Sequence, residues 1–319
     1  MKIAVIFSSQ TGNTEKIAYA IQRGVKRIAS HCDILRMKEA NPKRLYEYDL
    51  IGIGAPTHHG REPAWVSAFI KDMRFVGGKH CFVFSTHGTL PSNFMASIIP
   101  KLKSAGLIVI GWHDWYGGGN HAQYPGPWFT EGHPDAIDLR EAEDFGKEMV
   151  VRSVKISRGE TRLIPKEVPV MIDYGDFAYE KVFRDWPHPR FYAKFEREKC
   201  LYPACRLCME NCPWDGIDVT LEPPRLHQPC TYCGGLCEAV CPTGAINWDD
   251  YREAVNAWEK ENPLAKGHID KLGLPALREA ERQGIFRRYI SEEEVKSFVI
   301  PPNYYKKHPR FIIGVGRVI

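Results

Sequence analysis

The 319-residue sequence predicts an α/β protein with two folded parts: a doubly wound five-stranded parallel sheet, and a small α+β domain followed by a helical C-terminal extension. Two observations indicate this organisation. Residues 1–153 alternate short apolar runs with longer amphipathic ones, which is typical of a parallel sheet covered by helices. Eight of the ten cysteines then fall between positions 200 and 241. The chain is long enough for both parts to have their own core.

Five strands are expected in residues 1–153, at positions 2–8, 32–37, 49–54, 80–86 and 107–112. Helices are expected at positions 14–28, 62–71, 92–104 and 134–151. Connections between parallel strands cross over in a right-handed sense, so these elements predict a doubly wound sheet.

The composition is that of an ordinary globular protein. Apolar residues make up 44% of the chain and charged residues 26%, and the net charge is +4 with acids and bases interspersed. This pattern argues against a nucleic-acid or membrane-surface protein. No apolar run is long enough to span a membrane. Only Cys32 and Cys81 lie outside the cysteine-rich segment, which indicates a reducing, cytoplasmic setting rather than a disulfide-rich secreted scaffold.

The loop after the first expected strand has the chemistry of an anion site. Its backbone N–H groups and the following helix N-terminus face one point, and hydroxyl side chains and a glycine support them. An ordinary N-capped turn is the alternative, because Ser, Thr and Asn are common there. The residues concerned are Ser9, Gln10, Thr11, Gly12, Asn13 and Thr14.

These six residues resemble the FMN phosphate loop of flavodoxins, and the resemblance covers residues 1–153. It implies that FMN binds here and that the loops after strands three and four flank the isoalloxazine ring. In this sequence those loops contain Pro56, Thr57, His58 and His59, and then Thr86, His87 and Gly88. The histidines are the candidates for hydrogen bonding the flavin, stabilising its reduced anion or donating a proton.

Neither of these loops supplies the aromatic residue that usually stacks on the flavin in flavodoxins. The long segment 112–133 instead holds several aromatic residues around three glycines at 117–119, which is typical of a lid or binding loop. Two interpretations stay open. Trp115 and Tyr116 stack on FMN, or the aromatic residues are buried against the second domain.

Residues 154–196 lose the periodic pattern and gain proline and aromatic residues. A flexible linker would be rich in glycine and serine instead. We therefore expect an extended connector packed on the first domain.

The cysteines form two runs that each close with Cys-Pro. The first is Cys200-x4-Cys205-x2-Cys208-x3-Cys212-Pro213, and the second is Cys230-x2-Cys233-x3-Cys237-x3-Cys241-Pro242. Sulfurs spaced this closely suit an iron-sulfur cube and strain a disulfide. Zinc is the competing interpretation, but its sites usually use cysteine pairs with longer spacers. Short apolar strands are expected after each run, at 216–219 and 244–248.

Residues 197–248 resemble bacterial-type dicluster ferredoxins, in which the fourth cysteine of each run ligates the other cluster. The resemblance implies two 4Fe-4S clusters. One would be held by Cys200, Cys205, Cys208 and Cys241, and the other by Cys230, Cys233, Cys237 and Cys212. The gap of four residues after Cys200 and the gap of three after Cys233 depart from the family spacing, so we expect local distortion.

Residues 249–319 form a C-terminal extension with helical patterns at 249–260, 269–283 and 291–298, then an apolar end at 311–319. No chemistry is visible in it. Formation of a homodimer or docking of a partner is the hypothesis for its role.

FMN exchanges one or two electrons and an iron-sulfur cube exchanges one, so the combination predicts an electron-transfer protein with a redox protein as donor or acceptor. The alternative is an FMN-dependent reductase of a small organic substrate that receives electrons through the clusters. Clusters with a purely structural role in a binding protein are a third hypothesis. A nicotinamide site is not predicted, because no Gly-x-Gly-x-x-Gly motif follows a strand.

Overall fold

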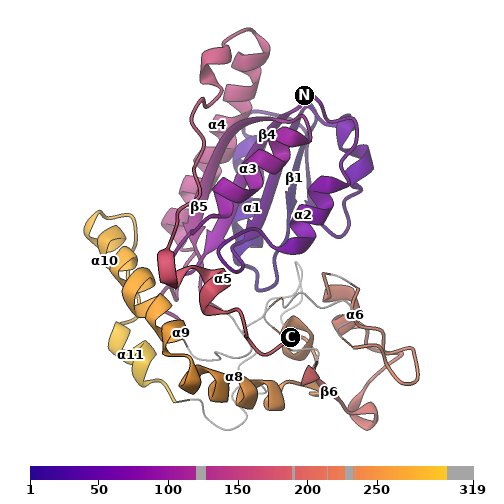
Figure 1. Ribbon diagram of the computed structural model, residues 1–319. Coiled ribbons are helices and arrows are strands. Elements are labelled where there is room, and N and C mark those ends of the chain that lie inside the picture. Colours follow the sequence, from indigo (N-terminus) through magenta and orange to yellow (C-terminus); the bar gives the residue numbers. More distant parts are fainter. Residues whose placement is uncertain (120–126, 189–190, 214, 227–232, 234, 300–319) are drawn as a thin grey trace. The chain divides into compact units, whose positions relative to one another are not determined.

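A computed structural model describes residues 1–119, 127–188, 191–213, 215–226, 233 and 235–299. The chain divides into two compact units (Figure 1). The first contains Met1–Ser9, Asn13–Gly118 and Thr130–Asp173, and the second contains Gln10–Gly12, Gly119–Phe129 and Tyr174–Ile319. The boundary after Asp173 falls inside the predicted connector.

The first unit is built on a parallel sheet in the order β2-β1-β3-β4-β5. The strands are β1 (Ile3–Phe7), β2 (Cys32–Arg36), β3 (Leu50–Pro56), β4 (His80–His87) and β5 (Ile108–Tyr116). The order reverses at β1, because β2 and β3 lie on opposite sides of it. The predicted doubly wound sheet is therefore confirmed, and its switch point lies between β1 and β3.

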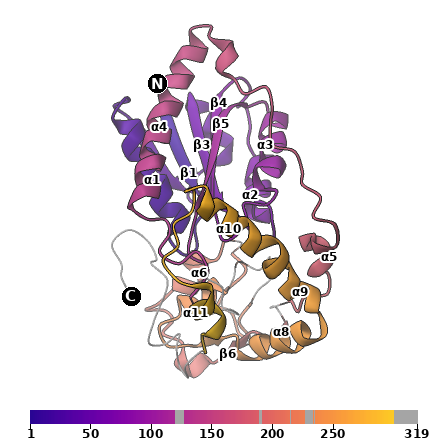
Figure 2. The same cartoon turned by 90° about the vertical axis from the view of Figure 1, so that its left-hand side faces the viewer.

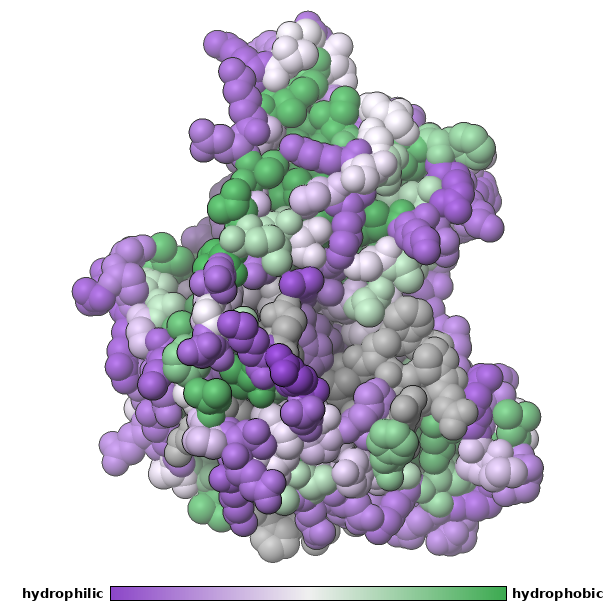
Figure 3. All heavy atoms as spheres, viewed as in Figure 1, coloured by the Kyte–Doolittle hydropathy of each residue, from purple (hydrophilic) through white to green (hydrophobic). Residues whose placement is uncertain are grey.

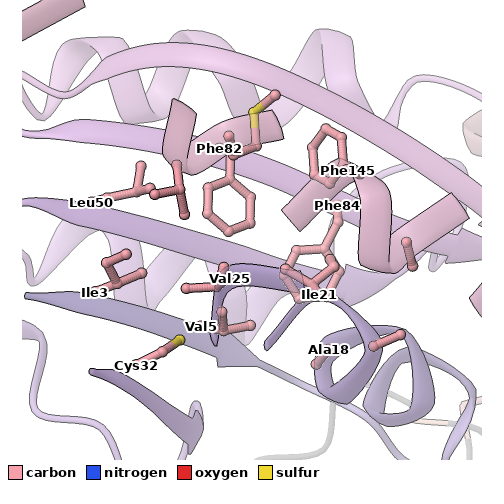
Figure 4. Close-up of a cluster of buried hydrophobic side chains, with 14 of the residues drawn as sticks. Ile3, Val5, Ala18, Ile21, Val25, Cys32, Leu50, Phe82, Phe84 and Phe145 are labelled. Carbon is pink, nitrogen blue, oxygen red and sulfur yellow. The ribbon is translucent and has the colours of Figure 1, made fainter. Parts of the chain in front are cut away.

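Helices cover both faces of this sheet. α1 (Asn13–Lys26) and α4 (Ala136–Ser157) lie on one face, and α2 (Ala64–Lys71) and α3 (Phe94–Ser104) lie on the other (Figure 2). Every residue of β1 and β4 is buried, as expected for strands covered on both faces. Figure 4 shows part of the core, in which Phe82, Phe84 and Phe145 pack with aliphatic side chains of β1 and α1.

The predicted end of the fifth strand is wrong. β5 continues from Trp112 to Tyr116, so Trp115 and Tyr116 lie on a strand and not in a loop. The reason is the length of β4. Its last three residues, Ser85 to His87, pair with Asp114 to Tyr116 and carry the ladder onward.

The second unit contains the cysteine runs, between short pieces of regular structure. β6 (Lys194–Phe195) precedes the first run and pairs antiparallel with β7 (Ile246–Asn247), which follows the second. A single bridge joins Asp218, after the first run, to Arg225, before the second. Each half of the repeat therefore contributes one segment to each of the two pairings. The strand expected at 216–219, after the first run, is reduced to this bridge.

Helices α6 (Leu207–Asn211) and α7 (Leu236–Ala239) lie within the two runs and contain Cys208 and Cys237. The extension is helical, as predicted, with α8 (Asp249–Glu261), α9 (Pro263–His268), a π-helical turn at Ile269–Gly273, α10 (Leu274–Arg282) and α11 (Glu292–Ser297). Among the described residues there are also a short helix, α5 (Tyr179–Val182), and 3-10 turns at Pro42–Glu47, Thr161–Leu163, Gly175–Phe177 and Arg197–Lys199. The apolar end at 311–319 lies outside the described residues.

Hydrophilic and hydrophobic side chains are interspersed over the face shown in Figure 3, in line with the mixed charge pattern of the sequence. None of the helices within the described ranges has the length and apolar character needed to cross a membrane.

Candidate functional site

The loop from β1 to α1 lies at the carboxyl end of the sheet, where the sequence predicts the anion site. Gly12 has φ of 89°, a left-handed conformation that favours glycine, and α1 begins at the next residue. The backbone N–H of Ser8 donates to Gly54 O at 2.9 Å, and its hydroxyl accepts from Trp65 Nε1 at 2.9 Å. The loop therefore starts from a position fixed by β3 and α2.

Side chains from the start of α1 hold the other predicted loops against it. The hydroxyl groups of Thr14 and Thr86 are buried and lie 2.7 Å apart. Asn13 Nδ2 donates to Gly118 O at 2.8 Å, and Thr57 N donates to Thr86 O at 2.8 Å. Residues from the ends of β3, β4 and β5 are thus brought together with the N-terminus of α1.

The loop after β3 makes a tight hairpin turn. His58 and Arg61 exchange both backbone hydrogen bonds, at 2.8 and 2.9 Å, and the two residues between them, His59 and Gly60, have φ of 51° and 75°. Two central residues with positive φ define a type I′ turn. His59 is exposed at its tip, whereas the His58 ring meets Trp65 edge to face at 5.4 Å.

His87 ends β4 and is buried. Its Nδ1 lies 2.9 Å from Gly88 O, and its Nε2 lies 2.9 Å from Asp114 Oδ2 on β5. Burial acts to raise the pKa of Asp114, but the hydrogen bond and charge of His87, with a contribution from His113, lower it below its ordinary value. Burial, together with the Asp114 charge, raises the pKa of Tyr116 to about 12.

The two predicted aromatic residues have different surroundings. Trp115 is 2% exposed and belongs to the core, where its ring stacks on His113 at 4.3 Å and meets Phe145 edge to face. Tyr116 lies between the rings of His87, at 4.7 Å, and His133, at 5.9 Å. Tyr116 is therefore the one of the pair that lies beside the flavin-loop residues. Tyr124, in the same aromatic segment, is outside the described ranges.

Sequence reasoning missed Trp65 and Asp114. Trp65 lies in the first turn of α2, where the apolar pattern marks it as an ordinary core residue. The sequence predicts that the fifth strand ends at position 112, so Asp114 falls in the loop that is expected to follow it. Alternation along 112–116 would have indicated a longer strand with Asp114 and Tyr116 on one face.

Unpaired polar atoms at this end of the sheet fit a polar ligand. Across the part of the chain that the structure describes, Gln10 Nε2 and Thr57 Oγ1 are buried without a hydrogen-bond partner. Buried polar groups normally have partners, so such atoms call for an explanation. One atom is in the predicted phosphate loop and the other is in the loop after β3. Both residue types and the left-handed Gly12 fit a phosphate-bearing ligand that contacts the backbone closely.

Cysteines from both runs gather in the second unit. Burial, together with the neighbouring thiols of Cys241, Cys200 and Cys205, raises the pKa of the Cys208 thiol to about 11. Three cysteines of the first run, Cys200, Cys208 and Cys212, pack against the same core as Cys237 of the second run.

The sulfurs of the last cysteine in each run, at equivalent positions of the repeat, accept backbone hydrogen bonds. Gly216 N donates to Cys212 Sγ and Ala245 N donates to Cys241 Sγ, each at 3.2 Å and each four residues after the cysteine. Cys237 is buried in the core with Trp248 and Tyr251. Cys233 and Cys208 both pack against the small cluster formed by Leu236 and Val240. Cys230 lies outside the described residues.

One group of potential metal-ligand residues lies outside the cysteine runs. In the described part of the chain, the one group of three potential ligand residues within 4.8 Å is His133, Asp135 and Asp138, and it contains no cysteine. That group forms the N-terminal cap of α4, where Asp135 accepts from the helix N–H groups and His133 Nδ1 lies 2.5 Å from Asp138 Oδ2.

Comparison with known proteins agrees with this division. A family model described as a flavodoxin domain matches residues 4–105. An uncharacterized protein of Methanocaldococcus jannaschii is 29% identical over 47% of this chain and 99% of its own length. A ferredoxin from the same archaeon is 41% identical over 49 residues, which are 15% of this chain and 77% of that protein.

An NAD(P)H dehydrogenase (quinone) of Archaeoglobus fulgidus is 28% identical over 49% of this chain and 98% of its own length. Among solved structures, an archaeal flavodoxin aligns over 48% of this chain and 99% of its own with 19% identity and a TM-score of 0.40. The chain therefore contains a flavodoxin-like domain, together with a stretch that is similar to an archaeal ferredoxin.

Proposed function

We propose that this protein is an electron-transfer flavoprotein that relays electrons between FMN and two 4Fe-4S clusters. Bound FMN would supply one- and two-electron chemistry, and each cluster would supply one-electron chemistry. A redox protein is the proposed donor or acceptor at the far end of the relay.

The observation that carries this proposal is the shared core of the second unit, against which Cys200, Cys208 and Cys212 of the first run pack with Cys237 of the second. Cysteines of two Cys-Pro runs brought together in this way fit the ligand exchange of dicluster ferredoxins, in which Cys241 would complete the cluster of Cys200, Cys205 and Cys208. By the same pattern, Cys212 joins Cys230, Cys233 and Cys237 at the second cluster. The N–H groups of Gly216 and Ala245 that donate to sulfur would stabilise the added negative charge on reduction.

In the flavodoxin-like domain, we assign the FMN phosphate to the loop of Ser9, Gln10, Thr11, Gly12, Asn13 and Thr14. This loop offers the α1 N-terminus and the unpaired Gln10 amide. The ring would lie between the two loops that contain Pro56, Thr57, His58 and His59, and Thr86, His87 and Gly88. Tyr116 is the proposed aromatic neighbour, because Trp115 is already enclosed by the core.

The test is anaerobic purification followed by quantification of iron, sulfide, zinc and FMN. About eight irons and one FMN per chain are expected from two cubes. Cys208→Ala should lose about half of the iron while FMN is retained, because one cube is lost. Cys81→Ala is the matched control, since Cys81 is buried within the sheet and outside both runs. Stoichiometric zinc, or equal iron loss in both variants, would refute the cluster assignment.

The alternative function is an FMN-dependent reductase of an organic substrate, and the similarity to an NAD(P)H dehydrogenase (quinone) favours testing it with a quinone. The protein, reduced anaerobically, is mixed with a water-soluble quinone or with an oxidised ferredoxin. A relay reoxidises quickly with the ferredoxin, whereas a reductase turns over the quinone with saturation kinetics. Saturable turnover with the quinone alone would favour the reductase.

A further inference from the structure

We propose that His87 is a positively charged positioning residue, held by Asp114 and Gly88, that biases the flavin site toward the reduced, anionic form of FMN. The inference rests on the proposed FMN site and adds the residue that would set its preference between redox states.

The hydrogen bonds of His87 define its charge. Nδ1 faces the Gly88 carbonyl oxygen and Nε2 faces an Asp114 carboxylate oxygen, both at 2.9 Å. Both oxygens only accept hydrogen bonds, so each ring nitrogen must carry a proton to donate. A neutral ring would leave one nitrogen lone pair facing an oxygen inside a site where the side chain is 2% exposed. The arrangement therefore selects the imidazolium.

The charged and titratable groups around the ring are consistent with this state. Asp114 is the carboxylate partner, and its lowered pKa keeps it ionised at neutral pH. Tyr116 packs against the His87 ring at 4.7 Å, and its raised pKa keeps the phenol neutral. His113 lies on the same strand as Asp114, but it is exposed and donates toward the Asp114 backbone carbonyl.

The same contacts fix the backbone of the loop after β4. Hydrogen bonding to His87 Nδ1 turns the Gly88 carbonyl toward the ring. In a trans peptide the C=O and the next N–H point in opposite directions, so the Thr89 N–H is directed away from His87. His87 thus sets both a positive charge and the orientation of a backbone donor in a loop assigned to the flavin.

A cation and an oriented donor near a flavin stabilise added negative charge. Replacement of His87 by glutamine keeps the size and a hydrogen-bonding amide but removes the cation, which leaves Asp114 uncompensated. Reduced FMN should then bind less tightly relative to oxidised FMN, by about tenfold, which corresponds to about 30 mV for a two-electron couple.

The experiment has two arms. In the first, 15N NMR of the FMN-free full-length protein at pH 7 should show protons on both ring nitrogens of His87, identified by the signals lost in His87→Gln. In the second, the dissociation constants of oxidised and reduced FMN are measured for wild type and His87→Gln. His31→Gln is the matched control, because it removes another histidine-aspartate pair, with Asp33, that is exposed at the opposite end of the sheet.

A single ring proton on His87, or an unchanged ratio of the two dissociation constants in His87→Gln, would overturn the inference. Failure of the wild-type protein to bind FMN would refute the proposed FMN site instead. In that event the NMR arm still decides the charge of His87, because it is measured on the FMN-free wild-type protein. The His87→Gln variant is needed only to assign the signals.

Discussion

The close crossing of α1 and α4 predicts that Gly146→Ala destabilises the first unit and weakens FMN binding. A Cβ at position 146 would lie 2.3 Å from the carbonyl oxygen of Ile21 and 2.9 Å from its carbonyl carbon. Both atoms belong to the α1 backbone and cannot rotate away, so the helices must separate by about 1 Å to restore van der Waals contact. Separation would open the core around Ile21 and Phe145.

The expected magnitude follows from two opposing effects. Overpacking costs about 1–3 kcal/mol, and a clash with backbone atoms lies in the upper part of that range, at about 2–3 kcal/mol. The better helix propensity of alanine offsets about 1 kcal/mol of this cost. A net loss of about 1–2 kcal/mol corresponds to a fall in Tm of about 2–8 °C for a unit of this size. Since α1 begins at Asn13, movement of the helix also displaces Asn13 and Thr14, and the affinity for FMN should fall with the Tm.

Thermal unfolding of the full-length protein is followed by circular dichroism and by release of FMN fluorescence, and hydrogen exchange locates the change in α1 and α4. Gly24→Ala should be more damaging, because its Cβ would lie 1.7 Å from Glu143 O, whereas Gly77→Ala is the control because nothing lies within 4 Å of its Cβ. The Tm is expected to be highest for Gly77→Ala, lower for Gly146→Ala and lowest for Gly24→Ala. A Tm for Gly146→Ala equal to that of the control would refute the reasoning.

Four more predictions address the sites. His59→Val should lower the free energy of unfolding by about 1–2 kcal/mol, because a β-branched residue is strained at φ of 51°; His59→Gly should not, and equal losses in urea denaturation would contradict the turn. Glu238→Gln should lower the free energy of unfolding of the second unit by about 1–3 kcal/mol, because the carboxylate accepts hydrogen bonds from Arg252 at 2.7 and 2.8 Å and from Trp248 N at 3.0 Å. Asp250→Asn, which removes an exposed ion pair with Lys194, should change this free energy by less than about 1 kcal/mol. Asn93→Ala removes both hydrogen bonds to the Ile172 backbone, at 3.0 and 2.7 Å, so hydrogen exchange of the Ile172 amide should become faster. An unaltered exchange rate would show that this side chain does not hold the connector. Because the folded pKa of Asp114 lies below its ordinary value of about 4, the carboxylate stabilises the folded protein at higher pH, and this stability is lost as the pH falls through the folded pKa. Asp114→Asn should therefore flatten the fall of the urea midpoint below about pH 4. An unchanged slope would argue against the His87 contact.

Local patterns in the sequence are sufficient to predict the parallel sheet and to locate the loop before α1 and the two cysteine runs. Apolar runs of β1 and β4 predict strands because both faces of these strands are covered. The loop before α1 is read from residue types alone, because glycine and hydroxyl side chains near a helix start act locally. The end of β5 was missed, since its last residues are held in the strand by the partner β4.

Contacts between residues far apart in the sequence were decided only by the tertiary structure. Nothing in the loop after β4 indicates that Asp114 reaches His87, that Trp65 donates to Ser8, or that the hydroxyls of Thr14 and Thr86 meet. Cysteine spacing identifies the runs by itself, but the packing of Cys208 and Cys233, one from each run, against the same small cluster requires the two halves to fold against each other. Sequence periodicity reports which face of an element is buried, whereas side-chain pairing depends on how the elements pack.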